Sequence, residues 1–419
     1  MTISAVLQHT RPNPDWGRFT VHGGDELERT AASLATSIRD AVSRHVPERT
    51  IRSLVLLGGY GRGEGGVEVT DRKHLLHNNF DILLVHPTRS APPVERMRAL
   101  RGALDELEDA FGVGIDVACQ SERHLKWAPS LVMWYDMRHG HKTLLGDAGF
   151  VPGLTRFRAD RIPEYDVRNL LINRAALLVL NHFLLDHVPD EGAIRRTVLK
   201  HTAKAIIGYG DALLHLHGRY HWSYRTKQER MRDLKDVPLP FRALYEEAAK
   251  FRLRPRYDDT SPESLREWLR DLTETLEPVH LSYESTRLAA PDLQWSGYPD
   301  IAARRELKGD LHVVRRTASK LKNLVRPPGA VRGRRLPCGI AGRALGVRGL
   351  LPLMLPAVLY PRAREALGPV ISNAFGLGAT DGRELRRAFL RHWRDHADPN
   401  LDLSLRRVGL DPRILEPST

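Results

Sequence analysis

Three short stretches decide the fold expected of this chain: LLGGYGRGEGG at residues 56–66, NNFDILLV at 78–85 and GIDVA at 114–118. Each includes or directly follows a short apolar run of the kind that forms a buried strand. The glycines after the first run indicate a tight turn at the end of that strand. Asp81 and Asp116 each alternate with apolar neighbours. In a strand, each carboxylate should therefore project from the face opposite to the one that carries those apolar neighbours. Two strands would then present two acids to one site.

The segments around these runs have the apolar spacing of helices. Residues 26–46 and 94–111 both repeat apolar side chains at intervals of three and four. The order helix, strand, loop, strand, helix, strand predicts a small mixed sheet backed by helices, in an α/β or α+β architecture. The pattern becomes mainly helical after residue 163 or so. We therefore expect a sheet domain at residues 1–150, a helical domain at 151–310, and a basic Pro/Gly-rich segment with a helical tail at 311–419.

Composition limits the class of protein. The chain has 419 residues, 42% of them apolar and 27% charged, which is typical of a folded globular protein with two or three domains. The net charge of +13 favours anionic partners such as nucleotides, nucleic acid or acidic lipid headgroups. Only Cys119 and Cys338 are present, far apart in sequence, which argues against a disulfide framework or a four-ligand zinc site and favours a reducing compartment.

The N-terminal sequence lacks the continuous apolar core of a secretory signal, and no run reaches the roughly 20 apolar residues of a membrane-spanning helix. We expect a cytoplasmic protein without a transmembrane segment.

The glycine cluster and the two acids are typical of a site for a triphosphate and Mg²⁺. Glycines such as Gly58 and Gly59 let the backbone approach phosphate oxygens, and their N–H groups can form a concave anion site. Arg62 would add a fixed positive charge. Asp81 and Asp116 offer the carboxylate oxygens that Mg²⁺ prefers in proteins.

These three stretches resemble the glycine turn, the paired-acid strand and the third-acid strand of DNA polymerase beta-type nucleotidyltransferases, a superfamily that includes aminoglycoside nucleotidyltransferases. The resemblance covers residues 27–120. It implies that Gly58 and Gly59 bind the triphosphate of a nucleotide such as ATP, that Asp81 binds metal, and that Asp116 binds metal and activates an acceptor hydroxyl.

The sequence departs from that family at Asn79, which stands where the family has its first carboxylate. An amide oxygen can still bind Mg²⁺, but without the charge the site should be weaker. The gap between the glycines and Asp81 is also long, and it contains Glu64, Glu68 and Asp71, any of which could replace the missing acid.

Two further basic regions are candidates for binding anions. Lys200 and Lys204 share one stripe of a predicted helix, where they either contact the triphosphate or form an ordinary solvated face. The aromatic and basic residues of 217–230 either bind a nucleotide or form a packing junction.

Residues 311–364 contain no acid and many arginines, so we expect a linker that could bind RNA, an acidic protein or headgroups. Within it, the apolar run 350–360 either contacts a membrane surface or is buried.

Two functions follow. One is Mg²⁺-dependent transfer of a nucleoside monophosphate to a hydroxyl on a small molecule, protein or RNA. The other is a catalytically silent protein of the same fold with a binding or regulatory role.

Overall fold

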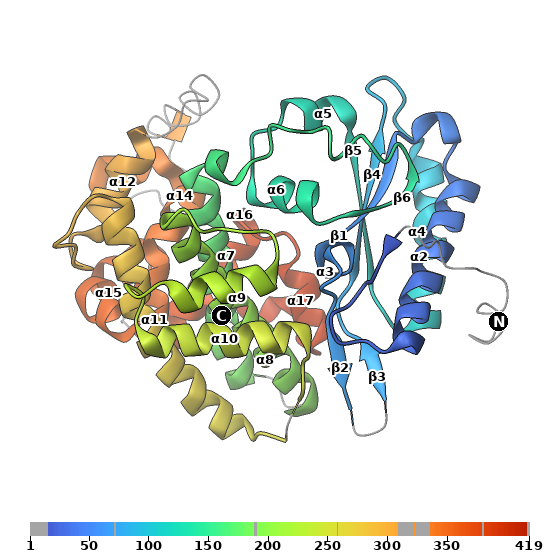
Figure 1. Ribbon diagram of the computed structural model, residues 1–419. Helices are drawn as coiled ribbons and strands as arrows, with labels where there is room; N and C mark the ends of the chain where they lie inside the picture. The colour runs from blue at the N-terminus through green and yellow to red at the C-terminus, as the bar shows by residue number, and fades with distance from the viewer. Residues whose placement is uncertain are drawn as a thin grey trace. The chain divides into compact units, whose positions relative to one another are not determined.

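A four-stranded sheet forms the centre of the N-terminal part of the computed structural model (Figure 1). Its strands lie in the order β5 (Ile115–Ser121), β4 (Phe80–His86), β1 (Ser53–Leu57) and β6 (Lys142–Gly146). The pair β4 and β5 is parallel, and β1 is antiparallel to both β4 and β6, so the sheet is mixed. The predicted fold class is confirmed: a small mixed sheet near the N-terminus is followed by a mainly helical region.

The two faces of this sheet have separate cores. Side chains that alternate along the strands, such as Leu56, Ile82 and Leu84, pack against α2 (Asp25–His45) and α4 (Val94–Phe111). The opposite set, which includes Val55, Leu83 and Val85, packs on residues of α5 (Glu122–Trp127), α6 (Val132–His139) and the segment 150–157. Full burial of such a side chain contributes about 1.5–3 kcal/mol, so this alternation holds each strand in its register.

The glycine segment is more regular than the predicted turn. Residues Gly58–Arg62 form the short helix α3, which ends at Gly63 in a left-handed conformation with φ of 76°. A two-stranded hairpin, β2 (Val67–Val69) and β3 (His74–Leu76), then accounts for the long gap before Asp81.

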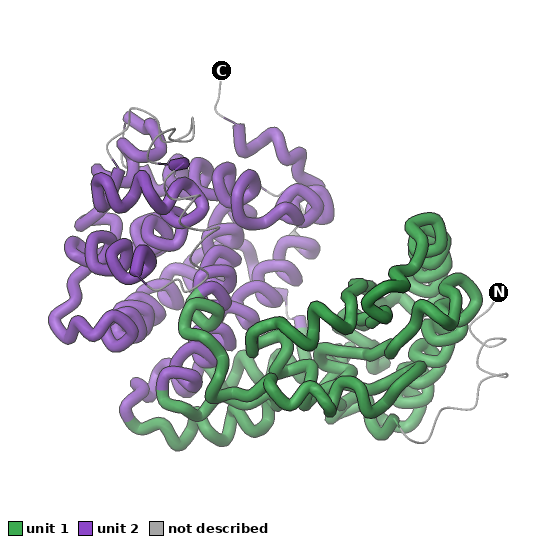
Figure 2. Tube along the Cα trace, turned by 90° about the horizontal axis from the view of Figure 1, so that it is seen from above, with its two compact units in different colours: residues 1–168, 217–235, 245–256 green, residues 169–216, 236–244, 257–419 purple. Residues whose placement is uncertain are grey.

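The chain divides into two compact units, coloured separately in Figure 2. Unit 1 contains residues 1–168, 217–235 and 245–256, and unit 2 contains 169–216, 236–244 and 257–419. We predicted three consecutive domains, whereas each of these two units combines segments that lie apart in the sequence. Helix α9 (Tyr224–Asp233) and the end of α10 (Leu239–Leu253) return to unit 1.

Unit 2 is built from helices. Its long helices are α8 (Glu191–Leu216) and α11 (Pro262–Arg287), together with most of α7 (Glu164–His187). Further helices in the described part of unit 2 are α12 (Tyr298–Lys308), α14 (Gly339–Leu359), α15 (Pro361–Phe375), α16 (Gly382–His396) and α17 (Leu401–Arg407).

Short 3₁₀ turns occur in both units, at Glu48–Thr50, Ala159–Arg161 and Pro412–Leu415. The structure describes residues 16–70, 73–187, 191–257, 259–308, 322–323, 336–378 and 381–416.

Helix α14 corrects the prediction of a loosely structured segment at 311–364. Pro352 and Pro356 lie inside the helix, and Gly346, with φ of 66°, forms a kink near its start. Most of its apolar side chains are buried, although Ile340 is exposed, and this packing outweighs the cost of the prolines. By length and hydropathy α14 could cross a membrane, contrary to our reading of the sequence, but 72% of its apolar window is buried inside the structure, as in core helices of soluble proteins. Most of the rest of 311–364 lies outside the described residues.

Candidate functional site

Asp81 and Asp116 are register partners on the parallel strands β4 and β5. Such partners project from the same face of a sheet, with Cβ atoms about 5 Å apart. This face also carries Leu83 and Val85, which are buried further along β4, whereas Asp81 is half-buried and Asp116 is exposed. The acids therefore lie where the buried part of this face ends.

The glycine segment reaches Asp81 directly. Gly58 follows β1, which pairs with β4 so that Leu57 lies opposite Asp81. Its φ is +65°, and a Cβ atom placed on it would lie 2.1 Å from Oδ2 of Asp81. Only glycine therefore allows the carboxylate to approach this backbone. The structure thus brings together Gly58, Asp81 and Asp116.

Asn79, which precedes Asp81 by two residues in the chain, contacts Asp116 on the neighbouring strand. Its Nδ2 donates a hydrogen bond of 2.8 Å to Oδ2 of Asp116. The opposite amide orientation would place two acceptor oxygens together, so the donor assignment is the physically favoured one. In this arrangement the Asn79 amide stabilises the charged Asp116 carboxylate by a hydrogen bond and does not present its oxygen there.

Glu64 has a different role from the replacement acid that we considered. Its side chain is buried and accepts hydrogen bonds from Ser223 Oγ at 2.6 Å and from the Tyr224 backbone N–H at 2.8 Å. These donors lie at the N-terminus of α9, where a negative charge is stabilising. Glu64 therefore fastens α9 to the glycine segment. Glu68 is also buried, and Asp71 lies outside the described residues.

Arg62 lies inside unit 1. Its side chain is only 7% exposed and forms an ion pair of 3.1 Å with Asp136, which also accepts a hydrogen bond from Tyr220. Burial alone would lower the pKa of Arg62, but Tyr224, Asp136 and Glu64 together raise it. Arg62 thus joins α3 to α6, and we no longer assign it to a phosphate.

Arg252 is a charged neighbour of the glycine segment that the sequence did not reveal. Its Nη2 lies 3.5 Å from the position of a Cβ on Gly59, and its Nη1 is buried with no hydrogen-bond partner among the described residues. The guanidinium also lies over the ring of Tyr224, with 5.5 Å to the centroid. Arg62 and Lys227 lie against the same ring, at 4.8 and 4.4 Å. Three cations thus surround one aromatic ring beside the glycines.

The region 217–230 forms the packing junction that was one of our two readings. Tyr220 and Lys227 are buried in it. Burial lowers the pKa of His22, and the charges of Arg254 and Arg225 lower it further.

Lys200 and Lys204 lie on α8 of unit 2, Lys200 half-buried and Lys204 exposed. Burial, and then the charges of Lys204 and Lys200, lower the pKa of His201 to about 3. Asp211, on the same helix, is buried. The two lysines belong to a different unit from Asp81 and Asp116.

Among the described residues, no group of three or more His, Cys, Asp and Glu side chains could hold a metal. The pair Asp81 and Asp116 nonetheless fits Mg²⁺, because this ion is commonly held by one or two carboxylates together with the phosphates of a substrate.

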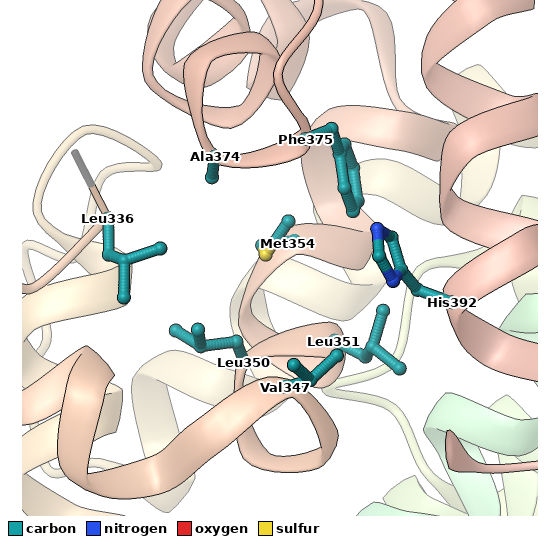
Figure 3. Close-up of a pocket in the computed structure, with 8 residues that line it drawn as sticks. All are labelled: Leu336, Val347, Leu350, Leu351, Met354, Ala374, Phe375 and His392. Atoms are coloured by element: carbon teal, nitrogen blue, oxygen red, sulfur yellow. The ribbon is translucent and has the colours of Figure 1, made fainter. Parts of the chain in front are cut away.

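The described part of unit 2 also has an apolar cavity, bordered by Met354, Phe375 and His392 (Figure 3). The two rings are stacked with centroids 5.4 Å apart. Its volume of about 10 Å³ is room for no more than a water molecule, so it is a packing cavity and not a ligand site.

Comparison with known proteins adds no relative. No family model, curated protein or solved structure matches this chain.

Proposed function

We propose that the chain is a nucleotidyltransferase, which moves a nucleoside monophosphate from a nucleoside triphosphate to a hydroxyl acceptor on a small molecule, protein or RNA. The proposal rests on the arrangement of three residues. The Gly58 backbone lies close to the Asp81 carboxylate, and Asp81 is the register partner of Asp116 on the next strand. A close backbone approach beside two acids suits a metal-bound triphosphate.

In the proposed reaction the acceptor oxygen forms a bond to the α-phosphorus while the bond from that phosphorus to the bridging oxygen breaks and pyrophosphate leaves. Asp116, the more exposed acid, accepts the hydroxyl proton. Asp81 and Asp116 would hold Mg²⁺, which offsets charge on the phosphates. The backbone at Gly58 and Gly59 binds the triphosphate.

The cation beside the glycines supports an anionic ligand. Among the described residues Arg252 has no ion pair, since Glu64 accepts hydrogen bonds from the start of α9 and Asp136 accepts from Arg62 and Tyr220. We infer that the positive charge of Arg252 strengthens triphosphate binding at Gly59.

One observation favours the silent alternative. Because residue 79 is an asparagine, the site has two carboxylates rather than three. One of them, Asp116, already accepts a hydrogen bond from Asn79. A protein with this arrangement would bind nucleotide with Mg²⁺ and release no pyrophosphate.

The test is an assay of the full chain with each of the four NTPs, Mg²⁺ or Mn²⁺, and pooled hydroxyl acceptors, with pyrophosphate release as the readout. Asp81→Asn is the matched loss of one charge at the site. Release that disappears in Asp81→Asn supports transfer. Mg²⁺-dependent nucleotide binding without release supports the silent alternative, and the absence of both binding and release rejects the site.

A further inference from the structure

Two arginines of unit 2 converge on the start of a helix. Arg364 lies on α15 and Arg386 on α16, and Gly382 is the first residue of α16. A Cβ atom on Gly382 would lie 2.7 Å from Nη1 of Arg364 and 3.4 Å from Nη1 of Arg386. The two guanidinium groups, which we call the arginine pair, therefore approach the same point.

Each guanidinium leaves hydrogen-bonding capacity at that point. Arg364 is held by its other nitrogens, since Nε donates to the Ala357 carbonyl at 3.2 Å and Nη2 to the Val358 carbonyl at 2.9 Å. For Arg386, Nε is buried and has no hydrogen-bond partner in the described part of the chain. No carboxylate in that part lies within ion-pair distance of either arginine. Arg364 is thus fixed in place with Nη1 directed at Gly382.

This arrangement is electrostatically unfavourable by itself. The N-terminus of a helix carries about half a positive charge, so two cations oppose it as well as each other. Burial lowers the pKa of both guanidiniums, and for Arg386 the neighbouring Arg364 lowers it further. The pKa of His182 falls to about 3, through burial first and then through Arg386, Arg364 and Arg270.

The nearby carboxylates only partly compensate. Asp381 caps α16 by accepting from the Arg383 backbone N–H, and Asp186 lies 3.7 Å from the guanidinium of Arg383. Both carboxylates still act on the charge of Arg386 at longer range. One more anion between the two guanidiniums would satisfy donors that the protein leaves open.

We propose that the arginine pair and the start of α16 form a binding site for a phosphate-type oxyanion, either free phosphate or the phosphate of a small monoester. Guanidinium groups match phosphate oxygens in geometry, and backbone N–H groups at a helix start add donors. This site lies within unit 2 and does not depend on nucleotidyl transfer in unit 1.

The test measures thermal unfolding of the full chain against inorganic phosphate, with chloride at equal ionic strength as the reference. Phosphate should raise the Tm of the unaltered protein in a saturable way. Arg386→Gln should weaken phosphate affinity by at least about tenfold, because it removes a charge-assisted contact. The same variant in chloride should be as stable as the unaltered chain or more so, since a repulsive charge is gone. Arg407→Gln, an exposed loss of one charge on α17, should keep the full response.

Gly382→Ala is the second variant, because its methyl group would enter the space between the guanidiniums without changing any charge. It should also abolish the phosphate response, whereas Gly102→Ala, in a helix with open space around it, should not. A parallel titration with glycerol 3-phosphate identifies the source: tighter binding than phosphate means an ester, and weaker binding means the free ion. No phosphate response in the unaltered protein, or an undiminished response in Arg386→Gln and Gly382→Ala, overturns the proposal.

Discussion

At the scale of single residues, Asn79 shows how a neutral side chain in place of an acid changes the dependence of a site on a bound cation. From sequence it reads as a metal ligand without its charge. In the structure its Nδ2 instead donates to Asp116, which removes a repulsion that two acids would have. The site is thus arranged to be stable without a cation, and an added acid should make its stability depend on one.

Asn79→Asp should therefore destabilise the metal-free protein and increase its response to Mg²⁺. Two carboxylates would face each other at the 2.8 Å that now separates Asn79 and Asp116. Because both residues are exposed, we expect a loss of about 1 kcal/mol, the lower end for like charges at this range. Mg²⁺ should restore the loss and bind more tightly than to the unaltered chain, as seen by thermal unfolding over a Mg²⁺ series.

The double variant Asn79→Asp with Asp116→Asn is the control for this prediction. It exchanges the acid and the amide, so the hydrogen bond and the single negative charge both return. Its metal-free stability should be close to that of the unaltered protein. An Asn79→Asp protein with unchanged stability and unchanged Mg²⁺ response would contradict this account of Asn79.

Glu64→Gln separates the two roles considered for that acid. Because Glu64 accepts from Ser223 and from the backbone of Tyr224, the neutral side chain should cost about 1–2 kcal/mol of stability, which chemical denaturation can measure. Mg²⁺ affinity should not change. A tenfold loss of Mg²⁺ affinity with little loss of stability would instead make Glu64 the missing metal ligand.

Sequence reasoning succeeds for residues whose signal is local. The alternation of Asp81 and Asp116 with apolar neighbours predicts their shared face, and the register of β4 and β5 places them side by side. Arg252 and the partners of Glu64 carry no such signal. The contact from Ser223 to Glu64 spans 159 positions, and nothing in the pattern near either residue indicates it.

At the scale of elements, the join between β1 and α3 is the part that the glycines make possible. Gly58 has a positive φ, and the Asp81 carboxylate occupies the space that a side chain at position 58 would fill. Gly112, at the end of α4, has the same φ of +65° but nothing within 4 Å of its absent Cβ. A side chain at either position would strain the backbone, but only a side chain at position 58 would also collide with Asp81. Comparing variants at the two positions therefore separates the effect of backbone strain from the effect of that contact.

Gly112→Ala should cost about 1–2 kcal/mol, the strain of a left-handed alanine alone. Gly58→Ala should cost more, because its methyl group must also displace the Asp81 carboxylate, and it should lose Mg²⁺-dependent nucleotide binding while Gly112→Ala retains it. Denaturant unfolding and nucleotide titration of the two variants provide the comparison. Equal losses of stability with intact binding in both would show that the contact between Gly58 and Asp81 is unimportant.

Element boundaries were predictable where the apolar periodicity is long. The helices expected at 26–46 and 94–111 are α2 and α4, each within about one residue of the predicted limits. The failures have physical causes. The hairpin of β2 and β3 has three residues in each strand, too few for a periodic signal, and α14 contains prolines that favour a loop by local preference alone. Burial of its apolar side chains decides the structure there.

At the scale of the whole molecule, the chain enters unit 2 and returns to unit 1 twice. Composition and periodicity describe neighbours in sequence, so they predicted domains that follow one another. The return of α9 depends on Glu64 and on the pair of Asp136 with Tyr220, which are long-range contacts. A binding residue of the proposed function can accordingly come from any part of the chain, and Lys200 and Lys204 of unit 2 are the ones that the sequence proposed.

If these two lysines contact the triphosphate, the double variant Lys200→Ala with Lys204→Ala should bind nucleotide at least about tenfold more weakly, as expected for the loss of charge-assisted contacts. Its stability should change by no more than about 0.5 kcal/mol per site, since neither side chain is fully buried. The matched control is Arg304→Ala with Arg407→Ala, which removes two exposed charges from unit 2. Because both double variants lower the net charge equally, a general electrostatic effect would weaken nucleotide binding in both. Weakening confined to the lysine variant would assign the contact to α8, and unaltered affinity there would return Lys200 and Lys204 to an ordinary solvated face.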